Sequence, residues 1–283
     1  MRPGFLVKII ALIFSLSILI SCSKTRILYN YSDWFLLKWF DTYFDLNEPQ
    51  RSELEKGIAR LLDWHRKSEL AGMAEHLTQL KSRYQRGLKG EDIDWIRIEH
   101  KLFWNKIMDH AEPDLVAFLS TVEERQVRQM EQEFIEKEDW LVKQAKMTAD
   151  EAKASTLKWF YGLLEKWMGD LEPDQKEQIA GWVKADLEWT AIKLENRNKF
   201  QAELAQLLRS KNNLKEKLHV WMHQPETHWT EAFKKQLERK KQEWKEIILK
   251  VDAITLPRQR QHAADELQKY IDDFLILSQQ PAS

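Results

Sequence analysis

The chain is poor in the residues that form tight turns, and it contains a single cysteine. Among its 283 residues there are eight glycines and seven prolines. Strand-rich folds need such residues at their many turns, so this scarcity favours helices. Cys22 has no second cysteine to pair with, so an internal disulfide is excluded and packing alone must hold the fold.

Neither sign of charge dominates the composition. Lys and Arg number 44 against 45 Asp and Glu, and the formal net charge at pH 7 is −1. Nucleic-acid binding requires concentrated positive charge, so we expect no nucleic-acid partner. Charged residues still make up 31% of the chain, which indicates a highly charged helical surface.

Sequence motifs of the common catalytic sites are also missing. The chain contains no Gly-rich phosphate loop, no G-x-S-x-G and no H-E-x-x-H. No Glu is followed by Ser, so the Glu-Ser signature of lytic transglycosylases, a class of all-α enzymes, is absent as well. We therefore expect no cofactor and no enzymatic activity.

The N-terminal segment has the order of a secretory signal peptide. Arg2 and Lys8 precede an apolar run over residues 9–20, which is shorter than the ~20 residues that a membrane span needs. We predict a signal peptide over residues 1–21. The ending Leu-Ile-Ser-Cys22 resembles the lipobox of bacterial lipoproteins. That resemblance implies that Cys22 takes a diacylglycerol on sulfur, becomes the N-terminus and carries a further fatty acid, such as palmitate, on nitrogen.

The residue after the cysteine bears on location. Ser23 follows Cys22, and by the sorting convention of Gram-negative lipoproteins a residue other than Asp there implies the outer membrane. Two acyl chains already hold a protein stably at a membrane, so three acyl chains on Cys22 would make its attachment effectively permanent. The mature chain, residues 22–283, is expected to face the periplasm. No linker rich in Pro, Gly or Ser divides it, so we predict a single all-α domain.

Apolar residues recur at helical spacing along the whole mature chain. Leu54, Ile58, Leu61 and His65 form one such stripe, and similar stripes predict an irregular bundle of roughly ten helices. Residues 173–209 contain no clear breaker and suggest one long helix. Breaks are expected at Gly87 and Gly90, Pro113, residues 169–173, Pro225 and Pro257.

A short motif ending in Gln recurs four times, each time before an amphipathic stretch. An apolar residue, then acids or Pro, then Gln is typical of a helix start, where the Gln side chain reaches back to the cap. The spacing between copies is uneven, unlike the fixed period of a solenoid, so we interpret the motif as recurring cap chemistry. The four copies are Leu46–Gln50, Val122–Gln126, Leu171–Gln175 and Thr255–Gln259.

An aromatic segment over residues 27–44 follows the lipidation site. Asp33, Lys38 and Asp41 are its only charges after Tyr29, too few for a wet polar face. Two interpretations are open: a central helix that the others wrap, or an interfacial element beside the anchor with its aromatic rings at headgroup level. The lack of a polar face favours the central helix. The thirteen tryptophans are spread evenly, which favours core packing over an aromatic groove.

Two polar clusters are candidates for chemistry. Asp63, His65, Arg66 and Glu69 lie at i, i+3 and i+4 spacings on one predicted helix. A network that locks two helices together is favoured over a proton-transfer pair, because one His–Glu pair carries little specificity. At i, i+4, His219 and His223 are weak candidates for a metal, with Glu226 or His228 nearby, and we predict no metal site.

Three segments carry a resemblance to a known family. Leu28–Trp34, Leu46–Gln50 and Trp64–Leu70 resemble an uncharacterised family of bacterial lipoproteins, domain of unknown function 6279. The resemblance implies an all-α secreted lipoprotein without an established activity. We expect a lipid-anchored, non-enzymatic module that binds or scaffolds an envelope protein. The alternative is a carrier or chaperone that holds an apolar ligand or unfolded polypeptide in a Trp-lined groove. A hydrolase using His65 and Glu69 comes third.

Overall fold

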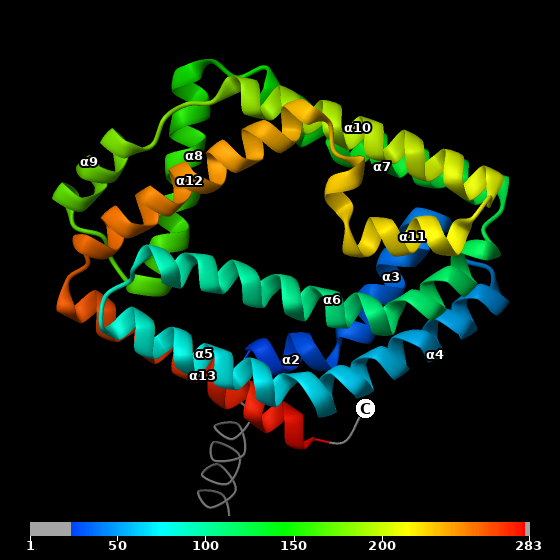
Figure 1. The fold of residues 1–283 in the computed structure, drawn as a ribbon, viewed down its shortest axis with the longest axis horizontal. Coiled ribbons are helices and arrows are strands. Elements are labelled where there is room, and N and C mark those ends of the chain that lie inside the picture. The colour runs from blue at the N-terminus through cyan, green and yellow to red at the C-terminus, as the bar shows by residue number, and fades with distance from the viewer. Residues whose placement is uncertain (1–23, 281–283) are drawn as a thin grey trace, which may run out of the picture.

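The computed structural model describes residues 24–280, and in that range every regular element is a helix (Figure 1). This confirms the predicted all-α fold. The signal peptide and Cys22 lie outside the described residues. None of the described helices is both long enough and apolar enough to cross a membrane. Viewed down the shortest axis, the helices form a ring, with α6 along its lower side, α7 and α10 at the upper right, and α8 and α12 at the upper left.

The helices differ widely in length, and two short elements of other helix types interrupt the α-helical series. A π-helix follows α4, and a 3₁₀ turn follows α11. The bounds are α2 Lys24–Asn30, α3 Ser32–Phe44, α4 Glu48–Trp64, η1 His65–Glu69, α5 Leu70–Gln85, α6 Gly90–Ser120, α7 Glu124–Ala145, α8 Ala149–Met168, α9 Pro173–Trp182, α10 Leu187–Ser210, α11 Leu214–His223, η2 Pro225–His228, α12 Glu231–Ala253 and α13 Pro257–Gln279.

Two buried clusters hold the ring together. In the first, α3, α4, α6, α7, α10 and α11 meet; in the second, α8, α9, α12 and α13 meet. Between these clusters α5 packs along α13, and α6 packs against α4. Fully enclosed side chains of the first cluster include Val122, Met130 and Leu208, and Ile179 and Val183 belong to the second.

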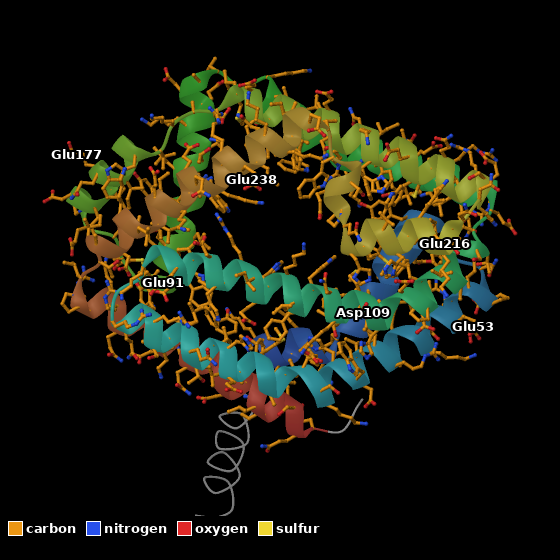
Figure 2. The ribbon with its side chains drawn as sticks, viewed as in Figure 1. Glu53, Glu91, Asp109, Glu177, Glu216 and Glu238 are labelled. Carbon is orange, nitrogen blue, oxygen red and sulfur yellow. The ribbon has the colours of Figure 1, made fainter. Side chains whose placement is uncertain are left out.

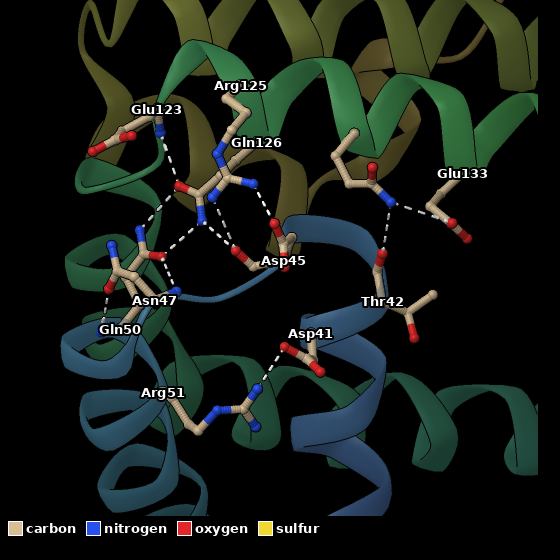
Figure 3. A network of polar contacts seen from close by, with 11 residues as sticks. Asp41, Thr42, Asp45, Asn47, Gln50, Arg51, Glu123, Arg125, Gln126 and Glu133 are labelled. Atoms are coloured by element: carbon tan, nitrogen blue, oxygen red, sulfur yellow. Dashed lines mark hydrogen bonds and ion pairs between the residues drawn. The ribbon is translucent and has the colours of Figure 1, made fainter.

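Each copy of the Gln motif begins a helix, as predicted, and the copies meet in pairs. Figure 3 shows the first pair, at the N-termini of α4 and α7. Nε2 of Gln50 donates to Oε1 of Gln126 at 3.1 Å, and Nε2 of Gln126 donates back to Oε1 of Gln50 at 2.7 Å. Gln175 and Gln259 exchange the same two bonds at 2.9 and 2.8 Å between α9 and α13. All four amides are buried.

The two pairs repeat the same set of hydrogen bonds. Each Gln accepts from the backbone N–H three residues before it, the cap position of its own helix. Each also donates to the backbone carbonyl five residues before its partner. One pair lies beside each buried cluster, next to Leu46 and Val122 of the first and Leu171 and Ile254 of the second. The caps therefore also join one helix hairpin to another at each of these places.

Two of the expected helix boundaries were wrong. Pro113 lies inside α6, where the missing N–H costs one helical bond while packing against α4 holds the helix. Gly57 permits that approach, because a Cβ built there would lie 3.0 Å from Cβ of Asp114. Residues 173–209 form two helices, since Val183 is extended and the Asp186 carboxylate accepts from the Trp189 N–H at 3.0 Å to cap α10.

The aromatic segment is not the central helix that we predicted. Only Tyr43 and Phe44 of α3 are buried, while Trp34 and Trp39 are 58% and 52% exposed. Leu37 and Phe40 face the first cluster, so α3 contributes one face to the core and leaves the other outside. Core packing was also too simple an interpretation of the tryptophans, because none of the thirteen is fully buried and five are exposed.

Candidate functional site

The predicted polar cluster lies at the π-helix η1, but its members face different partners. Asp63 pairs with Lys67 on the surface, their closest atoms 2.7 Å apart. Glu69 is buried and pairs with Lys106 of α6 at 3.1 Å. π-Helical turns occur often at functional sites, and η1 is one such turn, between α4 and α5. The structure does not join His65 and Glu69 by a hydrogen bond.

His65 and Arg66 of the π-helix contact α2, the first described helix. Nδ1 of His65 lies 2.9 Å from the Tyr29 hydroxyl, and a guanidinium nitrogen of Arg66 donates to the Asn30 side chain at 3.1 Å. Burial raises the pKa of Tyr29 to about 12, and burial lowers the pKa of His65 more than the charge of Glu69 raises it. A neutral imidazole bonded to a neutral phenol therefore holds α2 to η1.

This contact joins two of the three segments on which the resemblance to a family rests. Tyr29 and Asn30 come from the first segment, and His65 and Arg66 come from the third. Sequence reasoning identified both segments but did not pair them, and it missed Lys106. These contacts dock α2, which begins two residues after Cys22, onto η1.

His219 and His223 lie together at the C-terminal end of α11, over α6. Neither Glu226 nor His228, the neighbours expected from sequence, joins them, and His228 instead pairs with Glu203 at 3.0 Å. The carboxylate that does join them belongs to Glu112 of α6. That residue is more than 100 positions away, so no local spacing signalled it.

A large apolar cavity opens between α5, α8, α12 and α13. Its volume is about 490 Å³. Apart from Tyr84, Asp252 and Thr255, it is lined by aliphatic side chains, Met168, Phe160 and tryptophans. An adjoining cavity of about 430 Å³ shares two of its walls, Trp159 and Trp244, whose rings meet edge to face with centroids 5.9 Å apart. We call these two cavities together the tryptophan groove. Its tryptophan walls are Trp140, Trp159, Trp167, Trp189 and Trp244.

The second cavity of the groove carries charge. Asp186 pairs with Lys240 at 2.7 Å and with Arg239 at 2.8 Å. Burial acts to raise the pKa of Asp186, but the hydrogen bonds from Lys240 and from the Trp189 N–H hold it below its ordinary value. Lys193 lies half-buried, with its ammonium 5.7 Å from the Trp189 ring centroid, and burial lowers its pKa despite the opposing charge of Asp186. The groove thus combines an apolar end with a charged one, where Lys184, Lys193 and Lys240 line the cavity together with Asp186 and Glu243.

A third cavity, of about 390 Å³, lies between α3, α4, α6 and α11. It is lined almost entirely by apolar side chains, and His65 and Tyr29 stand at its wall. The tryptophan walls and the predicted polar cluster are therefore at separate places in the described part of the chain.

Comparison with known proteins gives a family and no activity. No curated protein and no solved structure matches the chain. A model described as a family of unknown function, DUF6279, matches residues 42–234, about two thirds of the sequence. The chain therefore belongs to this family of unknown function.

Proposed function

We propose that this chain is a membrane-anchored, non-enzymatic binding protein that holds an acyl-chain amphiphile in the tryptophan groove. The observation that carries the proposal is the apolar cavity of about 490 Å³, which falls within the ~300–1,000 Å³ of small-molecule pockets. Trp159 lines both cavities and is 59% exposed, so its ring is free to cover a bound apolar chain.

The charged end of the groove supports an anionic headgroup. A carboxylate or phosphate beside Lys193 would stabilise the ammonium that burial disfavours. The apolar chain would then lie past Trp159 toward Leu163 and Leu267, where the lining offers few polar partners. An unfolded polypeptide is the competing occupant, and the test below separates the two.

The test is a titration with cis-parinaric acid, a fluorescent fatty acid that accepts energy from nearby tryptophan. If the chain covers about 100 Å² of Trp159, Trp159→Ala removes about 2.5 kcal/mol at ~25 cal/mol/Å², or roughly 70-fold in Kd. Lys193→Gln should weaken binding of the acid but not of its methyl ester. Both side chains lie at the groove surface, so neither change empties a core position.

Trp34→Ala is the matched control, because Trp34 is as exposed as Trp159 but lies on α3. We expect it to bind the fatty acid like the parent chain. Equal affinity in the Trp159→Ala and Trp34→Ala variants would contradict the proposal. Saturable binding of an unfolded outer-membrane protein that the fatty acid does not displace would favour the polypeptide instead.

We also propose that the protein is attached through lipid on Cys22, with α2 and α3 lying against the membrane surface. Six large apolar side chains between residues 27 and 39 are 45–61% exposed, directly after that cysteine. Aromatic rings in such a position suit the headgroup region. Cys22→Ala should release the protein from washed membranes, and full retention would refute lipid attachment. The exposed residues are Ile27, Leu28, Tyr31, Trp34, Phe35 and Trp39.

The absence of enzymatic activity is likewise proposed from the site geometry. His65 is bonded to Tyr29, and Glu69 is paired with Lys106, so neither is arranged to pass a proton to the other. His65→Gln should keep full ligand binding, because His65 lies in the predicted polar cluster and not in the tryptophan groove.

A further inference from the structure

We infer that Glu112, His219 and His223 form a site for a divalent transition metal such as Zn²⁺, with Asp109 as a fourth ligand. The two histidines lie one turn apart at the end of α11, and the two carboxylates lie one turn apart on α6, which packs against it. In the view of Figure 2, Asp109 lies on α6 below α11. The four donors thus come as two pairs from two facing helices.

Two of the distances between donor atoms suit tetrahedral coordination, both of them from His223. Metal–ligand bonds of about 2.0–2.2 Å separate the ligand atoms of a tetrahedron by about 3.3–3.6 Å. Nε2 of His223 lies 3.6 Å from the Glu112 carboxylate and 3.4 Å from the Asp109 carboxylate. Nδ1 of His219 lies 2.7 Å from Glu112, so this pair must open by about 0.6–0.9 Å to share an ion.

Two of the four side chains are enclosed, while those of His219 and Asp109 are 53% and 61% exposed. The side chains of His223 and Glu112 are only 12% and 13% exposed, and Nε2 of His223 makes no hydrogen bond. Buried polar atoms without such a bond are rare in folded proteins. The donor atoms of Glu112, His219 and His223 all lie within 4.8 Å of one another.

The surrounding contacts hold the two helices in register. Nε1 of Trp104 on α6 donates to the Met222 carbonyl at 3.2 Å and so fixes the last turn of α11. Met222 lines the third cavity together with residues of α3, α4 and α6. A metal here would clamp α11 over that cavity. The ligand set of two imidazoles and carboxylates suits Zn²⁺ and excludes a preference for Ca²⁺ or Mg²⁺, which take oxygen ligands.

The first experiment titrates untagged protein with Zn²⁺ against a chromophoric chelator, since an oligohistidine tag would itself bind the metal. We expect one equivalent to bind, and zinc at about 100 times its Kd to raise the unfolding midpoint by about 5–10 °C. Co²⁺ in place of zinc should give the visible absorption of a tetrahedral complex.

Variants assign the ligands. His223→Ala should weaken zinc binding at least 100-fold, and His219→Ala, at a half-exposed position where folding is not at risk, at least tenfold. His262→Ala, at an exposed histidine of α13, is the control and should leave affinity unchanged. A protein that binds no zinc at micromolar concentration, or whose His219→Ala and His223→Ala variants bind it as tightly as the parent, overturns the assignment.

Discussion

The buried glutamine pairs should contribute strongly to the stability of the fold. Replacing Gln126 by Ala removes an amide that is 1% exposed and sits between the starts of α4 and α7. Four hydrogen bonds are lost: the two exchanged with Gln50, at 2.7 and 3.1 Å, one from the Glu123 N–H at 3.0 Å, and a long one to the Asp45 carbonyl at 3.5 Å. The Gln50 amide keeps its bonds to Thr121 but loses its buried partner.

The expected cost follows from those bonds. Each is worth about 0.5–1.5 kcal/mol net, and an unsatisfied buried group adds to the loss. We expect Gln126→Ala to lower the free energy of unfolding by about 2–4 kcal/mol, and the midpoint by about 5–15 °C. Gln132→Ala on the same helix is the control, because Gln132 is exposed and bonds only to Glu136. It should stay within about 0.5 kcal/mol of the parent.

A double-mutant cycle tests the pairing itself by urea denaturation. Gln50→Ala and Gln126→Ala together should cost about 1–2 kcal/mol less than the sum of the single changes, since they share the same bonds. Gln126→Ala and Gln259→Ala should add, because their glutamines share no hydrogen-bond partner. A Gln126→Ala variant as stable as Gln132→Ala, or strict additivity within the pair, would refute the reasoning.

Further predictions concern α2 and the α4–α6 contact. Burial holds the pKa of His65 below 6.5, so the unfolded chain binds the proton first as the pH falls. The free energy of unfolding should therefore decline below about pH 6.5. His65→Gln should flatten that decline, measured by urea denaturation at several pH values. Tyr29→Phe should cost about 1 kcal/mol, measured the same way, by removing the bond to His65. Gly57→Val should cost about 1–3 kcal/mol because its Cβ would meet Asp114, whereas Gly72→Ala, with open space around it, should be neutral or stabilising by up to about 1 kcal/mol.

Cap chemistry was predictable because its evidence is local. Asn47 and Gln50 are three residues apart, and their mutual bonds form within one turn of α4. The pairing of Gln50 with Gln126 was not predictable, since 76 residues separate them and any of the four copies could have met any other. The start of α10 was missed although its evidence is also local: Asp186 caps the helix, in a stretch whose only Gly or Pro after Pro173 is Gly181.

The aromatic segment was misjudged because composition was weighed without the direction of each side chain. Leu37, Phe40 and Phe44 recur at i, i+3 and i+7 and face the first cluster. Trp34 and Trp39 lie off that line and are exposed. A small number of charged residues does not show that a helix is central when its outer face is aromatic, because such a face also suits a membrane surface.

Sequence analysis raised a Trp-lined groove only as the less favoured alternative to core packing, for a related reason. Trp244 packs against the second buried cluster and also lines both cavities, so its place on an apolar stripe is the same whether it is core or binding wall. What distinguishes the two is the side chain across from it. Trp159, on α8, meets Trp244 edge to face and remains exposed, which leaves the second cluster open at this edge instead of closing it. Removing Trp159 should therefore affect ligand binding more than stability, whereas removing Trp244 should affect both.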